Sequence, residues 1–210
     1  MKVAGVASPP FVTPAIPPNC LFEAVFCYSD LAMAILPIHQ NGDLVLRQRA
    51  LQVPESLFDT PELRAMLITM TETLDNERDG VALAAPQVGI LYRIFVVRYD
   101  RMTDSKKAST ETSANIGVFI NPTFIKASRR QIEMPEGCLS VRRLYGTTLR
   151  HERITIKAQD EHGQWFTRGA GGILAQAFQH ETDHLDGMLF IDHAEDIYEQ
   201  AATVQHDEPK

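Results

Sequence analysis

The sequence is short of cysteine, of early basic residues and of long apolar runs. Its three cysteines are too few and odd in number for a disulfide framework, which favours a reducing compartment. No apolar run is long enough to span a bilayer, so we expect no membrane partner. No arginine precedes Arg47, and prolines interrupt the apolar start, which argues against a presequence or a signal peptide. The cytoplasm is the simplest predicted location.

Basic residues are also outnumbered by acidic ones. The net charge of -7 and the pI of about 5.5 argue against broad electrostatic binding to a nucleic-acid backbone. We therefore expect no specific nucleic-acid partner. One group of arginines lies close together in the sequence, and we interpret its members as ordinary surface charges: Arg129, Arg130, Arg142, Arg143, Arg150 and Arg153.

The composition is that of a globular protein, with 44% hydrophobic and 22% charged residues, and the length suits one domain. Proline and small residues dominate the first 32 positions, which we interpret as a poorly ordered and dispensable extension. We place the folded domain at residues 33–195 and a polar tail at residues 196–210.

The pattern of apolar residues predicts an α+β fold. Thr60 and Pro61 suit a helix start, and an apolar stripe at helical spacing follows them. A second helix is expected from Ile173 to a stop at Asp186-Gly187. The other expected elements are a helix over residues 60–78, strands over 92–99 and 116–128, a hairpin over 153–168 and a polar loop over 100–115.

The segment "FQHETDHLDG" places three candidate catalytic or metal-binding side chains on the second expected helix. His180 and His184 are four residues apart and face the same way, and Glu181 follows the first of them. This H-E-x-x-H pattern is typical of a metal site whose glutamate is the general base. The alternative is that three polar residues fall on a helix by chance.

Cys138, in "MPEGCLSV", is the candidate for a third ligand. It lies in a segment that we expect to be irregular and able to aim a side chain. A thiolate with two imidazoles suits Zn²⁺ or Fe²⁺. A buried free cysteine is the alternative. Structural zinc normally has four protein ligands, so three favour an open, catalytic position.

Three segments in this order resemble the motifs of the peptide deformylases: "GVALAAPQ" (80–87), "EGCLS" (136–140) and "QHETDH" (179–184). The resemblance extends from about Ile35 to about Asp192. It implies an α+β fold in which antiparallel sheets pack around a central helix that carries the two histidines. It also implies that the chain removes the formyl group from the N-terminal methionine of nascent polypeptides, with possible ribosome association.

The same resemblance implies residue roles. Cys138, His180 and His184 would bind one divalent metal, natively Fe²⁺, with Zn²⁺ or Ni²⁺ possible in isolated protein. Glu181 would be the general acid and base, while Gln87 and the backbone N–H of Leu139 would stabilise an oxyanion. The expected substrate contacts, some of which are equally well explained as plain core, are Val81, Ala82, Met134, Glu136, Ile173 and Ala177.

The sequence departs from the family pattern at three places. Ala82 stands where glycine is usual, so its methyl group could crowd the substrate backbone. Arg142-Arg143 replaces Pro-Gly in what we expect to be a loop beside the site, and Thr182 replaces a larger apolar residue. These changes bear on rate and preference. A metallopeptidase, or a deformylase-like protein that binds chain ends without turnover, remains as an alternative.

Overall fold

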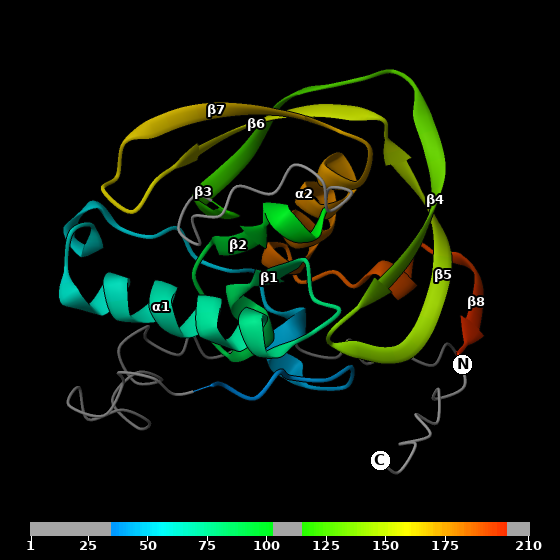
Figure 1. Ribbon diagram of the computed structural model, residues 1–210, viewed down its shortest axis with the longest axis horizontal. Coiled ribbons are helices and arrows are strands. Elements are labelled where there is room, and N and C mark those ends of the chain that lie inside the picture. The colour runs from blue at the N-terminus through cyan, green and yellow to red at the C-terminus, as the bar shows by residue number, and fades with distance from the viewer. Residues whose placement is uncertain (1–34, 103–114, 201–210) are drawn as a thin grey trace, which may run out of the picture. The chain divides into compact units, whose positions relative to one another are not determined.

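The computed structural model describes residues 35–102 and 115–200, and it has two antiparallel sheets and two α-helices (Figure 1). The predicted extension at residues 1–32 lies outside the described residues, as do residues 103–114 and 201–210. The α+β class and the antiparallel sheets are confirmed. Within the described part, no helix is long and apolar enough to cross a membrane.

The larger sheet has the order β1-β2-β3-β6-β7, and every pair in it is antiparallel. Its strands are β1 (Ala82–Ala84), β2 (Ile94–Arg98), β3 (Ile116–Ala127), β6 (Arg153–Gln159) and β7 (Trp165–Gly171). The predicted strands and the predicted hairpin are therefore present. Among the strands of the described residues, β1 is at the edge of this sheet, and only β2 lies beside it.

The smaller sheet has the order β4-β5-β8. Its strands are β4 (Gln131–Cys138), β5 (Val141–His151) and β8 (Glu195–Glu199). Two predictions were wrong here. The segment around Cys138 is the end of a strand rather than irregular, and residues 196–199 are part of β8 rather than of a polar tail. Pairing with β5 explains β8, because backbone hydrogen bonds form without any apolar pattern.

The first helix, α1 (Pro61–Asn76), starts as predicted. The hydroxyl of Thr60 accepts a hydrogen bond from the backbone N–H of Leu63 at 3.2 Å, which satisfies one free donor of the first turn. The predicted apolar stripe is buried and packs against β1 and β2: Leu63, Met66, Leu67, Met70 and Leu74. Short 3₁₀ turns occur at Leu44–Arg47, Glu55–Leu57, Ala85–Val88, Tyr99–Arg101 and Phe190–Asp192.

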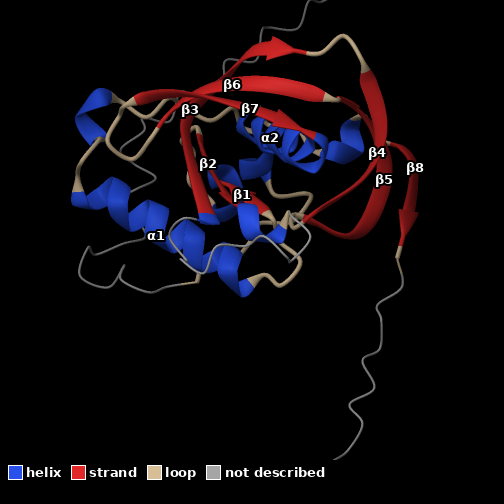
Figure 2. Cartoon of the chain, turned by 45° about the horizontal axis from the view of Figure 1, so that its top comes forward, coloured by secondary structure: helices blue, strands red, loops and turns tan. Residues whose placement is uncertain are grey.

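The second helix, α2 (Gly172–Leu185), contacts strands of both sheets (Figure 2). Its Phe178 is fully buried against Phe95 and Phe119, with ring centroids 5.7 and 4.6 Å away. Burying three phenylalanines together fixes the rotation of the helix about its axis. His180 and His184, on the same helix, are thereby directed toward the smaller sheet, where the site lies.

Candidate metal and hydrolytic site

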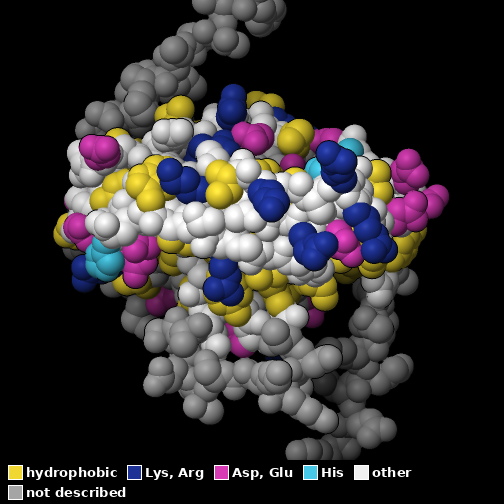
Figure 3. Space-filling model, turned by 90° about the horizontal axis from the view of Figure 1, so that it is seen from above, with side chains coloured by type: hydrophobic (Ala, Val, Ile, Leu, Met, Phe, Trp, Pro, Cys, Tyr) yellow, Lys and Arg dark blue, Asp and Glu magenta, His cyan; other side chains and the backbone are white. Residues whose placement is uncertain are grey.

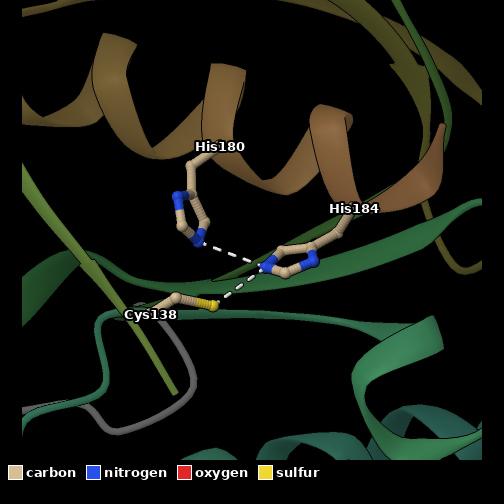
Figure 4. Close-up of side chains that lie close together, drawn as sticks. All are labelled: Cys138, His180 and His184. Atoms are coloured by element: carbon tan, nitrogen blue, oxygen red, sulfur yellow. Dashed lines mark hydrogen bonds between the residues drawn. The ribbon is translucent and has the colours of Figure 1, made fainter. Parts of the chain in front are cut away.

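Three metal-ligating side chains meet between α2 and the end of β4 (Figure 4). The Sγ atom of Cys138 lies 3.1 Å from Nε2 of His184, and that nitrogen lies 3.2 Å from Nε2 of His180. All the ligand atoms are within 4.8 Å of one another. His180 and His184 are buried, while Cys138 is half-buried. The three residues predicted from the sequence as metal ligands therefore lie close together in the structure.

A buried carboxylate fixes the orientation of the first imidazole. Nδ1 of His180 donates to Glu136, which also accepts from Arg150 at 2.7 and 3.0 Å and from the hydroxyl of Thr148 at 2.6 Å. Because Nδ1 carries the proton in this bond, the lone pair of Nε2 is available on the side of Cys138 and His184. Arg150 also donates to Asp183 at 2.6 Å, which ties the strand network back to α2.

Electrostatics hold the carboxylate of Glu136 in its charged form. Burial raises the pKa of Glu136, but hydrogen bonds from His180 and Arg150 outweigh burial and hold the pKa well below its usual range. Burial also lowers the pKa of His184 well below its usual value, so its imidazole stays neutral. A neutral imidazole is the form that binds a metal.

The sequence did not predict this hydrogen-bond network, and two of its residues were assigned other roles. We predicted that Glu136 contacts substrate, but it is only 5% exposed and its carboxylate is occupied by the bonds just described. Arg150 was interpreted as a surface charge, but it is 6% exposed. Alternation along β4 and β5 would have placed the two side chains on the same face of the smaller sheet, had those strands been recognised.

We expect Glu136→Gln to weaken both the fold and the cluster. Removing one partner of a buried ion pair leaves Arg150 partly unpaired, which costs about 3 kcal/mol of unfolding free energy. Losing the charged acceptor of His180 should lower metal affinity by about 10–100-fold. Chelator competition and urea unfolding measure the two effects.

The acid sensitivity of the same variant gives the control. Because the folded pKa of Glu136 is depressed, its stabilisation is present above its ordinary pKa of 4.5 and is lost as pH falls through the folded value. The difference in stability between wild type and Glu136→Gln should therefore shrink below pH 4.5. A difference that stays constant with pH would contradict the ionised pair.

Glu181 is a buried carboxylate with spare bonding capacity. It is 3% exposed, and among the described residues its Oε2 atom has no hydrogen-bond partner. Burial raises its pKa to about 7, against the opposing effect of His180. A carboxyl group whose pKa is near neutral can both accept and return a proton.

Gln87 and Leu139 lie beside the thiol. Nε2 of Gln87 is 3.6 Å from Sγ of Cys138 and donates to the hydroxyl of Ser140 at 3.1 Å. Its Oε1 atom accepts from the backbone N–H of Ala84 at 2.8 Å, which holds the amide in one orientation. Leu139 is in the turn between β4 and β5, directly after Cys138. Both predicted oxyanion donors are thus close to the cluster.

The predicted substrate contacts differ in exposure and in the direction of their side chains. Val81 and Met134 are half-buried, and Ala177 is 7% exposed on α2. Ile173 is 54% exposed in the first turn of α2, and it stays a predicted substrate contact. The side chain of Ala82 belongs to the apolar cluster that includes Phe95 and Phe178. Its methyl group therefore points into the core rather than toward a substrate.

The double arginine forms part of β5 rather than of a loop. Arg142 donates to both carboxylate oxygens of Glu77 at 2.9 and 3.2 Å, and Arg143 pairs with Glu199 at 2.8 Å. Thr182 is buried, and its hydroxyl donates to the carbonyl of Phe178 at 2.7 Å. The positive charges of Arg142 and Arg143 are therefore balanced by two carboxylates.

The fold and the cluster together define an α+β protein in which one cysteine sulfur and two imidazoles meet beside a buried carboxylate. The model of the polypeptide deformylase family matches residues 35–200. A peptide deformylase of Dehalococcoides mccartyi is 40% identical over 163 residues, 78% of this chain and 88% of that protein. Peptide deformylase 1 of Clostridium perfringens is 42% identical over 161 residues, 77% and 99% of the two chains.

Solved structures agree with these relatives. A class I type b peptide deformylase from Acinetobacter baumannii with bound Met-Ala-Ser aligns with a TM-score of 0.67 and 29% identity, covering 76% of this chain and 98% of that one. A peptide deformylase from Synechococcus elongatus in complex with actinonin aligns with a TM-score of 0.68 and 35% identity, covering 79% and 83%. The chain belongs to the peptide deformylase family, and the resemblance seen in its sequence is confirmed.

Proposed function

We propose that Cys138, His180 and His184 hold one divalent metal ion, and that α2 is the catalytic helix of a deformylase acting on formyl-methionyl nascent peptides. Membership in the family supports the reaction, namely removal of an N-formyl group. The observation that carries the residue assignment is the convergence of one sulfur and two Nε2 atoms beside Glu181.

The donor set fits such an ion. The bond from His180 to Glu136 leaves Nε2 of His180 free to coordinate, and one thiolate with two imidazoles suits Fe²⁺ or Zn²⁺. Three protein ligands leave a position open for chemistry. We propose Fe²⁺ as the native ion, with Zn²⁺ or Ni²⁺ in isolated protein. When bound, the ion would supply Lewis acidity, polarising the formyl carbonyl and lowering the pKa of water.

Glu181 moves the protons of the reaction. Its Oε2 atom takes a proton from the attacking water as the new C–O bond forms. The same carboxyl then gives a proton to the amine nitrogen as the C–N bond breaks, which releases formate and a free N-terminus. General acid–base catalysis of this kind contributes about 10²–10⁴-fold in rate.

The side-chain amide of Gln87 and the backbone N–H of Leu139 donate hydrogen bonds to the formyl oxygen and stabilise the negative charge that develops on it. Each fixed donor of this kind stabilises the transition state by about 3 kcal/mol. The bond from Ala84 fixes the amide of Gln87 before substrate arrives, so little reorganisation is needed. When the oxyanion forms, the Nε2 group of Gln87 would donate to it instead of to the hydroxyl of Ser140.

The edge of β1 offers a place for the peptide backbone. Because β2 is the one described strand that pairs with β1, an extended substrate can add as the next strand of the larger sheet. Val81, Met134 and Ala177 remain our candidates for contacts to the methionine side chain. We also propose a cytoplasmic location and contact with the ribosome, because nascent chains are the substrate.

We expect Ala82→Gly to leave catalysis nearly unchanged and to destabilise the fold. The methyl group packs in the core, so its loss opens no space for substrate. Glycine in a strand costs about 0.5–1 kcal/mol of unfolding free energy, while kcat/KM for formyl-Met-Ala-Ser should change by less than about threefold. Urea unfolding and formate release measure these quantities. An increase in kcat/KM of more than about tenfold would mean that Ala82 obstructs the substrate.

X-ray absorption at the metal edge tests the ligand assignment. Protein loaded with Fe²⁺ or Zn²⁺ should show one sulfur and two imidazole nitrogens as protein ligands. Cys138→Ser should remove the sulfur contribution and His184→Ala one imidazole. A first shell without sulfur in the wild type would refute the proposed ligand set.

A further inference from the structure

The outer side of strands β3, β6 and β7 differs in charge from the rest of the molecule. These three strands are adjacent in the larger sheet, and none of their residues is aspartate or glutamate. The whole chain, in contrast, has 27 acidic and 20 basic residues. The segregation creates a locally positive surface on a protein of net charge -7.

Strand register places the cations on one face. Lys126 lies opposite Thr155, and Lys157 lies opposite Thr123. Residues that alternate with these, Ile154 and Ile156, are buried and therefore point the other way. Figure 3 looks onto the side of the molecule where β6 and β7 lie in Figure 1, and it shows several Lys and Arg side chains across it. We call Lys126, Arg129, Arg153 and Lys157 the basic face.

Most of the basic face lacks acidic partners. Within the described ranges, Lys126, Arg129 and Arg153 form no ion pair, whereas Arg142 and Arg143 each pair with a glutamate. The ammonium group of Lys157 lies 4.5 Å from the ring centroid of Trp165. Arginines that looked equivalent in the sequence therefore separate into paired ones and free ones.

The three free cations surround a hollow. Its volume is about 740 Å³, and its lining includes the backbone of two glycines: Lys126, Ser128, Arg129, Arg153, Ile154, Thr155, Gly169, Ala170 and Gly171. A Cβ atom at Gly169 would meet no atom within 4 Å, so the hollow is open above the strand. The first turn of α2, which begins beside it at Gly172, contains no acidic residue. No carboxylate of this turn would repel an anion.

We propose that the basic face binds the phosphate backbone of RNA. Unpaired cations around an open hollow match phosphate groups spaced along a strand, and positive charge on an acidic protein is complementary to a polyanion. Trp165 is 54% exposed at the same face and offers a ring on which a base can stack. The contact depends on phosphate charge rather than on base sequence, so it is compatible with the prediction that the chain has no specific nucleic-acid partner.

Fluorescence anisotropy of a labelled oligouridine of about 20 nucleotides, titrated with the full-length metal-loaded protein, tests this proposal. Lys126→Glu/Arg153→Glu reverses two charges of the face. Arg64→Glu/Arg78→Glu is the matched control, because both residues are exposed on or next to α1, carry no ion pair among the described residues and give the same net charge. Vesicles containing phosphatidylserine test the competing anionic surface.

The basic-face variant should bind RNA at least about tenfold more weakly than wild type, and its plot of log affinity against log salt should be shallower by about 0.7 for each lost contact. The control should stay within about twofold, and both variants should keep wild-type formate release, which shows that they are folded. Lys126→Gln/Arg153→Gln should give an intermediate loss. The proposal is overturned by absence of RNA binding at low salt, by equal losses in the two double variants, or by binding to vesicles without binding to RNA.

Discussion

Glu181→Gln is expected to lower kcat for formyl-Met-Ala-Ser by about 10²–10⁴-fold, because it removes the group that accepts and returns the proton. Glutamine has nearly the same shape as the buried glutamate, and Oε2 of Glu181 has no partner to lose among the described residues. KM, metal content and unfolding free energy should therefore change little. A coupled assay of formate release measures the rate.

Asp186→Asn is a suitable control for that variant. It removes a carboxylate directly after α2, one that pairs with Arg93 rather than with the cluster, so we expect turnover close to wild type. If Glu181→Gln kept more than about a tenth of the wild-type rate with full metal content, another group would have to be the base.

The pH profile of the wild type extends this prediction. Burial raises the pKa of Glu181 to about 7 in the protein alone. A divalent cation in the cluster lowers that pKa, since it favours the carboxylate. The decline of kcat/KM toward acid pH should therefore begin below pH 7. Once the base is protonated, kcat/KM should fall by about tenfold per pH unit. Glu181→Gln should lack this limb.

Cys138→Ser is expected to have the second large effect, on metal binding. A serine hydroxyl stays protonated near neutral pH, so the site loses an anionic ligand and keeps two neutral imidazoles. We expect affinity for Fe²⁺ or Zn²⁺ to fall by at least about 100-fold, with loss of formate release. Metal per chain after desalting, and competition with a chelator, measure the change.

The other two cysteines supply the control. Cys20→Ser/Cys27→Ser removes the same chemical group from positions that the sequence places in the N-terminal extension. We expect this variant to keep one metal per chain and full activity. Retention of a full equivalent of tightly bound metal by Cys138→Ser would show that the thiol is not a ligand.

Much of the fold was predictable because it follows from local periodicity. The apolar stripe from Leu63 to Leu74 predicted α1, and alternation predicted β3 and the hairpin of β6 and β7. The same helical spacing placed His180 and His184 on one face. These features need only the geometry of one element.

The rest depended on partners distant in the sequence. Pro135 and Gly137 suggested an irregular segment, yet β4 forms because β5 pairs along its whole length. Arg150 looked like a surface charge, but on β5 it lies on the same sheet face as Glu136 of β4 and forms hydrogen bonds with it. Ala82 seemed to face substrate, but pairing with Val97 turns its methyl group into the core. The last two errors concern side chains whose direction is set by the strands that carry them.

The most direct test of the central claim is the product of the reaction itself. Full-length protein loaded anaerobically with Fe²⁺ should convert formyl-Met-Ala-Ser to formate and Met-Ala-Ser in a 1:1 ratio, with no cleavage of internal peptide bonds. Mass spectrometry and formate detection follow both products. Binding without formate release would indicate a protein that recognises chain ends without turnover, and internal cleavage would indicate a peptidase; either result would contradict a deformylase mechanism at this site.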